Sequence, residues 1–186
     1  MATTNGKKRK RGNSFVWKNV VVAVIAVALI VVLARLVQIF ALPRSGEQVS
    51  SVLPGAIIAL TEEQRAQNQL GNLTTNALLT QAAQNAANDM ATKGYFAHIS
   101  PDGTTPWDWL IQAGYHYQYA GQNLAVNFDD SQQLVNAWMA SPTHRANMLD
   151  PHYTQIGVGM ATGTYQGQEA VFVVQFFASP QQQSSR

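Results

Sequence analysis

Apolar residues recur at helical spacing most clearly between Thr75 and Lys93. From Leu78 to Met90 every fourth residue is apolar, and each of these residues is followed by another apolar one. Such a run forms one broad apolar stripe on the surface of a helix. Because Gly94 follows directly and can end a helix, the pattern predicts an amphipathic helix over Thr75 to Lys93 that packs against a sheet.

Three shorter helices are predicted from caps and helix breakers. Thr61 precedes two glutamates, and acidic residues favour the first turn of a helix. Pro106 is acceptable at a first helical position. The predicted segments are Thr61 to Leu70, Thr105 to Ala113, and one that begins near Asp129 to Ser131 and is interrupted at Ser141-Pro142.

Strand patterns lie mainly in the last third of the chain. Gln155 to Ala161 alternates around glycines, and Glu169 to Ala178 is a β-branched and aromatic run. Thr162 to Gln168 would join these two strands as a hairpin, and Asn123 to Phe128 is a third candidate strand. Helices around a small antiparallel sheet predict an α+β sandwich.

A long apolar segment stands apart from this pattern, from Val20 to Leu42. As a helix it would be roughly 35 Å long, which is enough to cross a bilayer. The run KKRKR at Lys7 to Arg11 precedes it, and positive residues stay on the cytoplasmic side. We therefore expect a single-pass signal anchor with residues 1–19 in the cytoplasm. A cleaved signal peptide, with Val32 and Ala34 before the cut, is the alternative.

Charge supports the same division. The chain has a net charge of +2, but from Arg44 onward five basic residues face all ten acidic ones, which gives 5 − 10 = −5. The basic run abuts an apolar segment, so it indicates membrane topology and not nucleic-acid binding. We expect a linker over residues 43–58, one domain over 59–178 and a disordered tail over 179–186. The absence of cysteine from the chain excludes disulfides and thiol catalysis.

Several ordered motifs between Ala59 and Ala178 are similar to those of one known family. They are FAHISPDG, AGQNLAV, SPTHRANML and HYTQIGVG, followed by the final strand VFVVQFFA. Together they resemble the bacterial branch of the CAP superfamily, named for cysteine-rich secretory, antigen-five and pathogenesis-related proteins. The resemblance implies a three-layer α-β-α sandwich with a cleft over the sheet, in which many members bind a divalent cation through two histidines and two glutamates.

Residue by residue, the resemblance places five side chains at this cleft. His98 and His152 match the two family histidines, and His144 belongs to the bacterial pattern. Gln122 and Ser141 stand where glutamates are usual. A neutral amide and a hydroxyl are weaker ligands than carboxylates, so a zinc ion held by His98 and His152 would be bound weakly. Gln122 also cannot serve as a general base.

Structural roles for these residues remain open. His98 could tie down the turn SPDG that follows it, and His144 could bridge the helix end at Ser141-Pro142. Tyr115, Tyr117 and Tyr119 could line a sugar-binding groove or pack at the edge of the sheet.

Three functions therefore fit the sequence. The first is a membrane-anchored extracytoplasmic domain whose cleft binds a glycan, lipid or envelope protein without catalysis. The second is a metal-assisted or histidine-based hydrolase of envelope or peptide substrates. The third is a structural adhesion or envelope-assembly module. Gln122 argues against the second.

Overall fold

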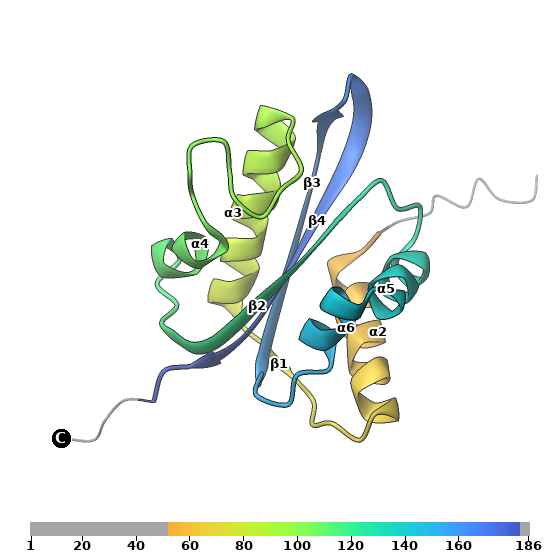
Figure 1. The fold of residues 1–186 in the computed structure, drawn as a ribbon, viewed down its shortest axis with the longest axis vertical. Coiled ribbons are helices and arrows are strands. Elements are labelled where there is room, and N and C mark those ends of the chain that lie inside the picture. Colours follow the sequence, from red (N-terminus) through yellow and green to blue (C-terminus); the bar gives the residue numbers. More distant parts are fainter. Residues whose placement is uncertain (1–51, 183–186) are drawn as a thin grey trace, which may run out of the picture. The chain divides into compact units, whose positions relative to one another are not determined.

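The computed structural model describes residues 52–182. Within this range the chain forms five helices and four strands (Figure 1). They are α2 (Pro54–Gln67), β1 (Thr74–Thr75), α3 (Ala77–Lys93), α4 (Pro106–Gln112), β2 (Tyr117–Val126), α5 (Ser131–Ala140), α6 (Pro142–Met148), β3 (Gln155–Tyr165) and β4 (Gln168–Pro180). No helix of the described part has the length and apolar character needed to span a membrane. The predicted anchor at 20–42 lies outside the described residues.

The sheet is mixed, whereas the sequence predicts an antiparallel sheet. Its strand order is β1-β3-β4-β2. The β3–β4 and β4–β2 pairs are antiparallel, whereas β1 pairs with β3 in parallel, Thr74 opposite Gln155 and Thr75 opposite Ile156. A strand of two residues carries no alternation of polar and apolar positions, which is why the sequence pattern does not predict β1.

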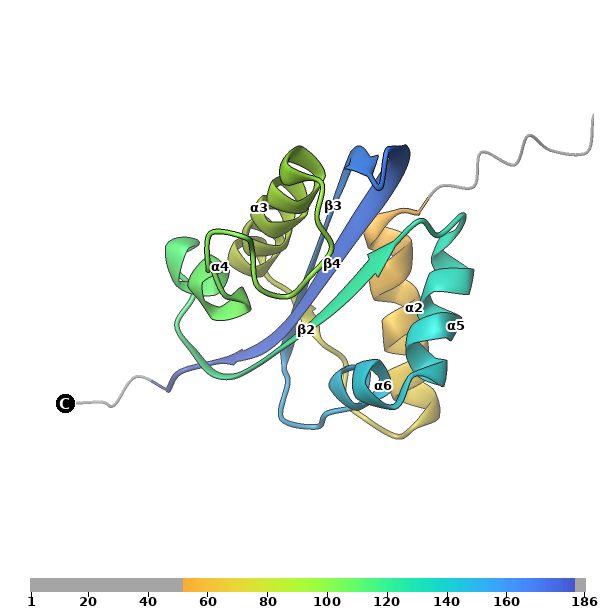
Figure 2. The same ribbon diagram turned by 45° about the horizontal axis from the view of Figure 1, so that its top comes forward.

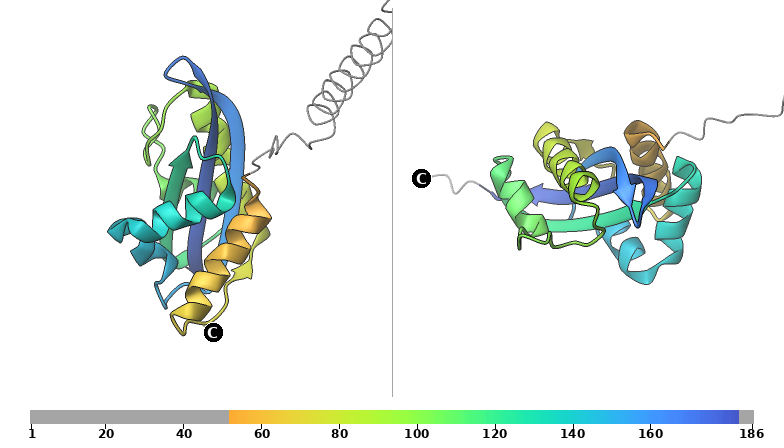
Figure 3. Two further views of the ribbon diagram at one scale, coloured as in Figure 1. Left: turned by 90° about the vertical axis from the view of Figure 1, so that its right-hand side faces the viewer. Right: turned by 90° about the horizontal axis from the view of Figure 1, so that it is seen from above.

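Two helical layers cover the sheet, which confirms the predicted α+β sandwich. Helices α3 and α4 lie on one face, and α2, α5 and α6 lie on the other (Figures 1 and 3). Each face has its own apolar core: Leu79, Met90 and Phe176 belong to the first, and Trp138 and Phe177 to the second. Neighbouring residues of β4 thus face opposite layers, as the alternation of a strand requires.

Two helices differ from the prediction. Helix α2 begins at Pro54, so the last residues of the predicted linker are helical, and Thr61 is an interior residue whose hydroxyl donates to the carbonyl of Ile57. Ser141-Pro142 interrupts the helix as predicted, since α5 ends at Ala140, but Pro142 also begins the separate helix α6, because proline has no N–H to lose in a first turn. The other helix starts are confirmed within two residues, with side-chain caps from Asn76, Thr105 and Asp130.

Glycines of β3 allow α3 to approach the sheet closely. A Cβ atom added at Gly157 would lie less than 3.0 Å from backbone atoms of Leu79 and Thr80, and one at Gly159 would meet the backbone of Ala83 and Gln84 in the same way. These contacts are with backbone, which cannot move aside without shifting the helix. The small residues of the predicted strand therefore set the distance between the two layers.

We predict that Gly157→Ala lowers the free energy of unfolding by about 3 kcal/mol or more, because α3 must move away from β3. Urea unfolding of residues 44–186 measures this. Gly55→Ala is the matched control, since a Cβ there meets nothing within 4 Å, and it should leave stability unchanged or raise it by up to about 1 kcal/mol. Equal effects of the two substitutions would contradict the close approach.

Candidate functional site

The loop that carries His98 is fastened to the end of α3. Asp89 accepts a hydrogen bond from the Tyr95 hydroxyl at 2.6 Å and pairs with Lys93 at 2.6 Å. Lys93 also pairs with Asp102 across the loop. Burial, and then the bond to Asp89, raise the pKa of Tyr95, so its hydroxyl stays protonated and keeps donating. The loop is thus held at both sides of His98.

A turn after His98 completes this loop. The Ser100 hydroxyl accepts from the backbone N–H groups of Asp102 and Thr104, and Ser100 is 5% exposed. The turn predicted from SPDG is therefore held by Ser100, and the His98 side chain is left to contact the sheet.

His98 contacts Gln122 directly. The His98 Nδ1 and Gln122 Oε1 atoms are 2.7 Å apart, and the loop between α3 and α4 passes beside β2 (Figure 2). An amide oxygen only accepts hydrogen bonds, so Nδ1 carries the proton and donates. Gln122 is 7% exposed, whereas His98 is exposed. The Nε2 atom of His98 remains as an acceptor for another group.

A chain of buried amides lies behind this pair. Gln175 of β4 donates to the Thr61 hydroxyl at 3.0 Å and accepts from Asn123 at 3.2 Å. Asn123 also donates to the backbone carbonyl of His144 and accepts from Asn147 at 2.9 Å. Thr61, Asn123 and Gln175 are fully buried. The network therefore links α2, β4, β2 and α6 through satisfied hydrogen bonds alone.

Helix α6 brings His144 to the edge of β2. The Asn147 amide donates to the carbonyl of Gln122 at 3.1 Å, which fixes the helix beside the strand. His144 Nδ1 lies 2.8 Å from the Ser141 hydroxyl, and its ring stacks on Trp138 with centroids 6.5 Å apart. The structure thus places four of the five predicted residues in two contacting pairs, His98 with Gln122 and Ser141 with His144.

The two pairs also influence each other. Burial, and then the charge of His98, lower the pKa of His144 below its ordinary value of 6.5. The neutral form of His144 is therefore favoured at neutral pH, which keeps a lone pair on its ring.

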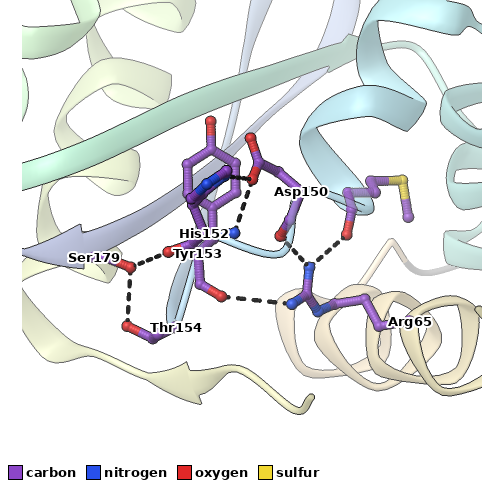
Figure 4. A network of polar contacts seen from close by, with 7 residues as sticks. Arg65, Asp150, His152, Tyr153, Thr154 and Ser179 are labelled. Atoms are coloured by element: carbon purple, nitrogen blue, oxygen red, sulfur yellow. Dashed lines mark hydrogen bonds and ion pairs between the residues drawn. The ribbon is translucent and has the colours of Figure 1, made fainter. Parts of the chain in front are cut away.

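Arg65 fixes the loop between α6 and β3, which carries His152 (Figure 4). Its guanidinium donates to the carbonyls of Gly71, Met148, Asp150 and Tyr153. Arg65 is 1% exposed, and burial lowers its pKa. A buried cation bound by carbonyl oxygens holds the conformation of the loop, because each of those carbonyls would lose its partner if the loop moved.

His152 has different partners from the other histidines. Its Nδ1 lies 2.8 Å from Asp150, and its ring lies on Tyr119 with centroids 4.8 Å apart. Its side chain is 59% exposed. Within residues 52–182, His152 makes no hydrogen bond with His98, Gln122 or His144. Tyr119 is three residues before Gln122, or about 10 Å along the strand, so His152 borders the pair without joining it.

The donor set fits a zinc site poorly. Over the described range no group of three or more histidine, aspartate or glutamate side chains is placed to hold a metal ion. The oxygens of Gln122 and Ser141 are already engaged with His98 and His144. Zinc binding by His98 and His152, which the resemblance implies, therefore stays a prediction.

A shallow hollow of about 410 Å³ lies on the other side of α6. Its lining includes Pro142, Arg145 and Leu149, whereas the backbone carbonyl of His144 and the side chain of Asn147 bond to β2. The hollow is therefore separate from the histidine–amide pairs.

The sequence motifs do not reveal Asn123, Asn147, Gln175 and Arg65 as positioning residues. One signal was present: Gln175 interrupts the apolar run FVVQFF, and a polar residue in the middle of a buried strand needs a partner. Arg65 has no such signal, because an arginine on a helix is ordinarily exposed.

We predict that Asn123→Ala lowers the free energy of unfolding by about 2–4 kcal/mol, since it leaves the oxygen of Gln175 and the carbonyl of His144 without their donor. Urea unfolding measures the loss. Asn136→Ala, which removes an exposed amide of α5 bonded only to Gln132, should change stability by less than about 0.5 kcal/mol. Similar losses in both variants would show that the amide network contributes no special stability.

Acid should destabilise the domain partly through His144. Its pKa is lower in the folded state, so below about pH 6.5 the unfolded chain binds a proton that the folded chain does not, and stability falls as the pH falls. We predict that the stability difference between about pH 7.5 and about pH 5.5 is smaller in His144→Gln than in the parent chain. Urea unfolding at both pH values tests this, with His116→Gln as the exposed control. An unchanged difference would refute it.

Comparisons with known proteins agree with this architecture. A model of the cysteine-rich secretory protein family, CAP, matches residues 58–177. The chain is 37% identical over 103 residues to the uncharacterized protein YkwD of Bacillus subtilis (strain 168), covering 55% of this chain and 40% of that protein. It is 32% identical over 104 residues to the uncharacterized membrane protein YlbC of the same organism, covering 56% and 30%. The match thus spans less than half of either relative.

Solved structures show the same fold. An extracellular protein containing an SCP domain from Bacillus anthracis (str. Ames) has a TM-score of 0.57 at 29% identity, covering 67% of this chain and 39% of that one. An outer surface protein of Borrelia burgdorferi has a TM-score of 0.59 at 20% identity, covering 67% and 90%, and this shows the fold alone. Because the family model matches more than half of the chain, the chain belongs to the cysteine-rich secretory protein family, CAP.

Proposed function

We propose that this chain is a membrane-anchored extracytoplasmic CAP-domain protein that binds a ligand at the surface around His98, Gln122, Ser141 and His144, with His152 at its border. Its ligand would be a glycan, a lipid or an envelope protein. The N-terminal apolar segment would hold the domain at the membrane, with the basic residues inside. The extracellular and membrane relatives support this location without testing it in this chain.

The observation that carries the proposal is the contact between His98 and Gln122. A glutamate at this position could accept a proton and act as a general base, whereas an amide can only donate and accept hydrogen bonds. The pair still presents an exposed imidazole beside a second histidine that favours its neutral form. A surface of this kind is suited to recognising polar groups on a ligand.

One contact favours a second function, a histidine-based hydrolase. Asp150 lies against Nδ1 of His152, an arrangement that orients the imidazole in many catalytic sites. However, the same carboxylate oxygen also accepts from the backbone N–H of His152, as an aspartate in a tight turn does. Within the described residues, the hydroxyls of Ser100 and Ser141 bond to other groups and not to His152. We therefore prefer the binding function.

We predict that Gln122→Glu strengthens zinc binding at least about tenfold, because it adds a negative charge beside His98 and His144. Titration calorimetry of residues 44–186 measures the affinity of the parent and variant domains.

Two controls make the result specific. Gln168→Glu adds the same charge at the start of β4 and should leave the affinity unchanged. His98→Ala in the Gln122→Glu background should remove the gain. An unchanged affinity in Gln122→Glu would contradict a shared site. Tight binding by the parent, lost in His98→Ala and His152→Ala, would favour the hydrolase instead.

A further inference from the structure

A second hollow lies where α3 begins and β4 ends, and none of the residues that line it belongs to the histidine–amide pairs. It has a volume of about 530 Å³. Its polar lining consists mainly of side-chain amides and two ring residues: Asn76, Tyr115, His116, Gln155, Gln181 and Gln182. Among residues 52–182, no aspartate, glutamate, lysine or arginine lines it. The hollow therefore matches an uncharged ligand rich in hydrogen-bonding groups.

Hydrogen bonds between three lining residues fix the orientation of the Gln155 side-chain amide in this hollow. The oxygen Oε1 of Gln155 accepts from the Tyr115 hydroxyl at 2.7 Å and from the Asn76 amide at 3.0 Å. Both lone pairs of that oxygen are thus used, which fixes the orientation of the amide. Burial raises the pKa of Tyr115 to about 12, so its hydroxyl remains a donor.

The nitrogen of Gln155 is left for a ligand. Among residues 52–182 its Nε2 atom has no hydrogen-bond partner, and that range contains no buried side-chain nitrogen or oxygen without one. The Nε2 atom is therefore accessible. Asn76 also retains one unused N–H, because its oxygen caps α3 and only one of its two amide hydrogens bonds to Gln155.

An extended peptide does not suit this place. Peptides commonly bind by adding a strand to an open sheet edge. Here the backbone is already paired: Tyr117 pairs with Pro180, and the N–H of Gln181 donates to the carbonyl of His116 at 3.0 Å. Pro180 has no N–H to offer. Recognition must therefore use side chains, and planar amides that donate and accept are well suited to sugar hydroxyl and acetamido groups.

We propose that this hollow binds an uncharged glycan segment bearing N-acetyl groups, with an acetamido carbonyl accepting from Nε2 of Gln155. Gln181 and Gln182 at the rim would bond to ring hydroxyls, and the exposed His116 and Leu78 would cover a face of the sugar. The proposal does not depend on the function of the histidine–amide pairs.

The test uses the full chain in detergent micelles and titration calorimetry with the β-1,4-linked tetramer of N-acetylglucosamine. The matching glucose tetramer differs only in having a hydroxyl in place of each acetamido group. We expect saturable binding of the acetylated tetramer, weaker binding of the glucose tetramer, and at least about a tenfold loss of affinity in Gln155→Glu. This substitution keeps an oxygen for Tyr115 and Asn76, removes the N–H donors and adds one negative charge.

Two further variants keep the test decisive. Gln168→Glu adds the same charge at the far end of β4 and should bind as the parent does. Gln181→Ala removes a rim amide, keeps the backbone bond to His116, and should weaken binding even if Gln155→Glu does not fold. The proposal is overturned if neither tetramer binds or if both bind equally. It is also overturned if a folded Gln155→Glu binds like the parent, or if an N-acetylated neutral peptide binds and the tetramers do not.

Discussion

The buried amides of Asn123 and Gln175 are the constraint on which the candidate site depends. They lie between the sheet and the layer formed by α2, α5 and α6, where an unpaired amide would cost a large part of the domain's stability. Each must therefore keep its partners, and those partners include the backbone carbonyl of His144. The position of α6 relative to β2 follows from this requirement.

Consecutive side chains of β2 point to opposite faces of the sheet, and this connects the buried amides to the histidines. Asn123 faces the layer with α6, so Gln122 faces the layer with α3 and meets the loop that carries His98. Two elements from opposite layers thus present histidines at one edge strand. Arg65 positions His152 in a similar way. Its buried guanidinium donates hydrogen bonds to backbone carbonyls of the segment before β3, which holds the loop that carries His152. Hydrogen bonds and ion pairs of polar side chains thus hold the three segments that carry the histidines.

The sequence predicted most of the fold because its signals were local. The period of α3, the caps of α4 and α5, and the runs of β3 and β4 each lie within one segment. The early start of α2 and the separate helix α6 are not predicted, because Pro54 falls in the expected linker and Pro142 at an expected helix end, although proline also suits a first helical position. Strand β1 was missed because pairing between Thr74 and Gln155 depends on residues far apart in the chain.

The candidate site was predictable only through the motifs. Those motifs named His98, Gln122, Ser141 and His144, and the structure brings them together as two contacting pairs. They did not show that His152 has different partners from His98 and His144, because its contacts with Asp150 and Tyr119 arise from a loop conformation. Nor did they reveal the glutamine-lined hollow, because Asn76, Gln155 and Gln181 come from three distant segments without a common pattern.

His98 and Gln122 form an oriented hydrogen-bonded pair in which Nδ1 of the histidine donates to the amide oxygen. Nitrogen-15 NMR of the imidazole rings, recorded where histidines are uncharged, reads the tautomer of His98 directly. We expect the form protonated at Nδ1, and a shift toward the form protonated at Nε2 when Gln122→Ala removes the acceptor. A His98 ring already protonated at Nε2 in the parent domain, or unaffected by Gln122→Ala, would contradict it.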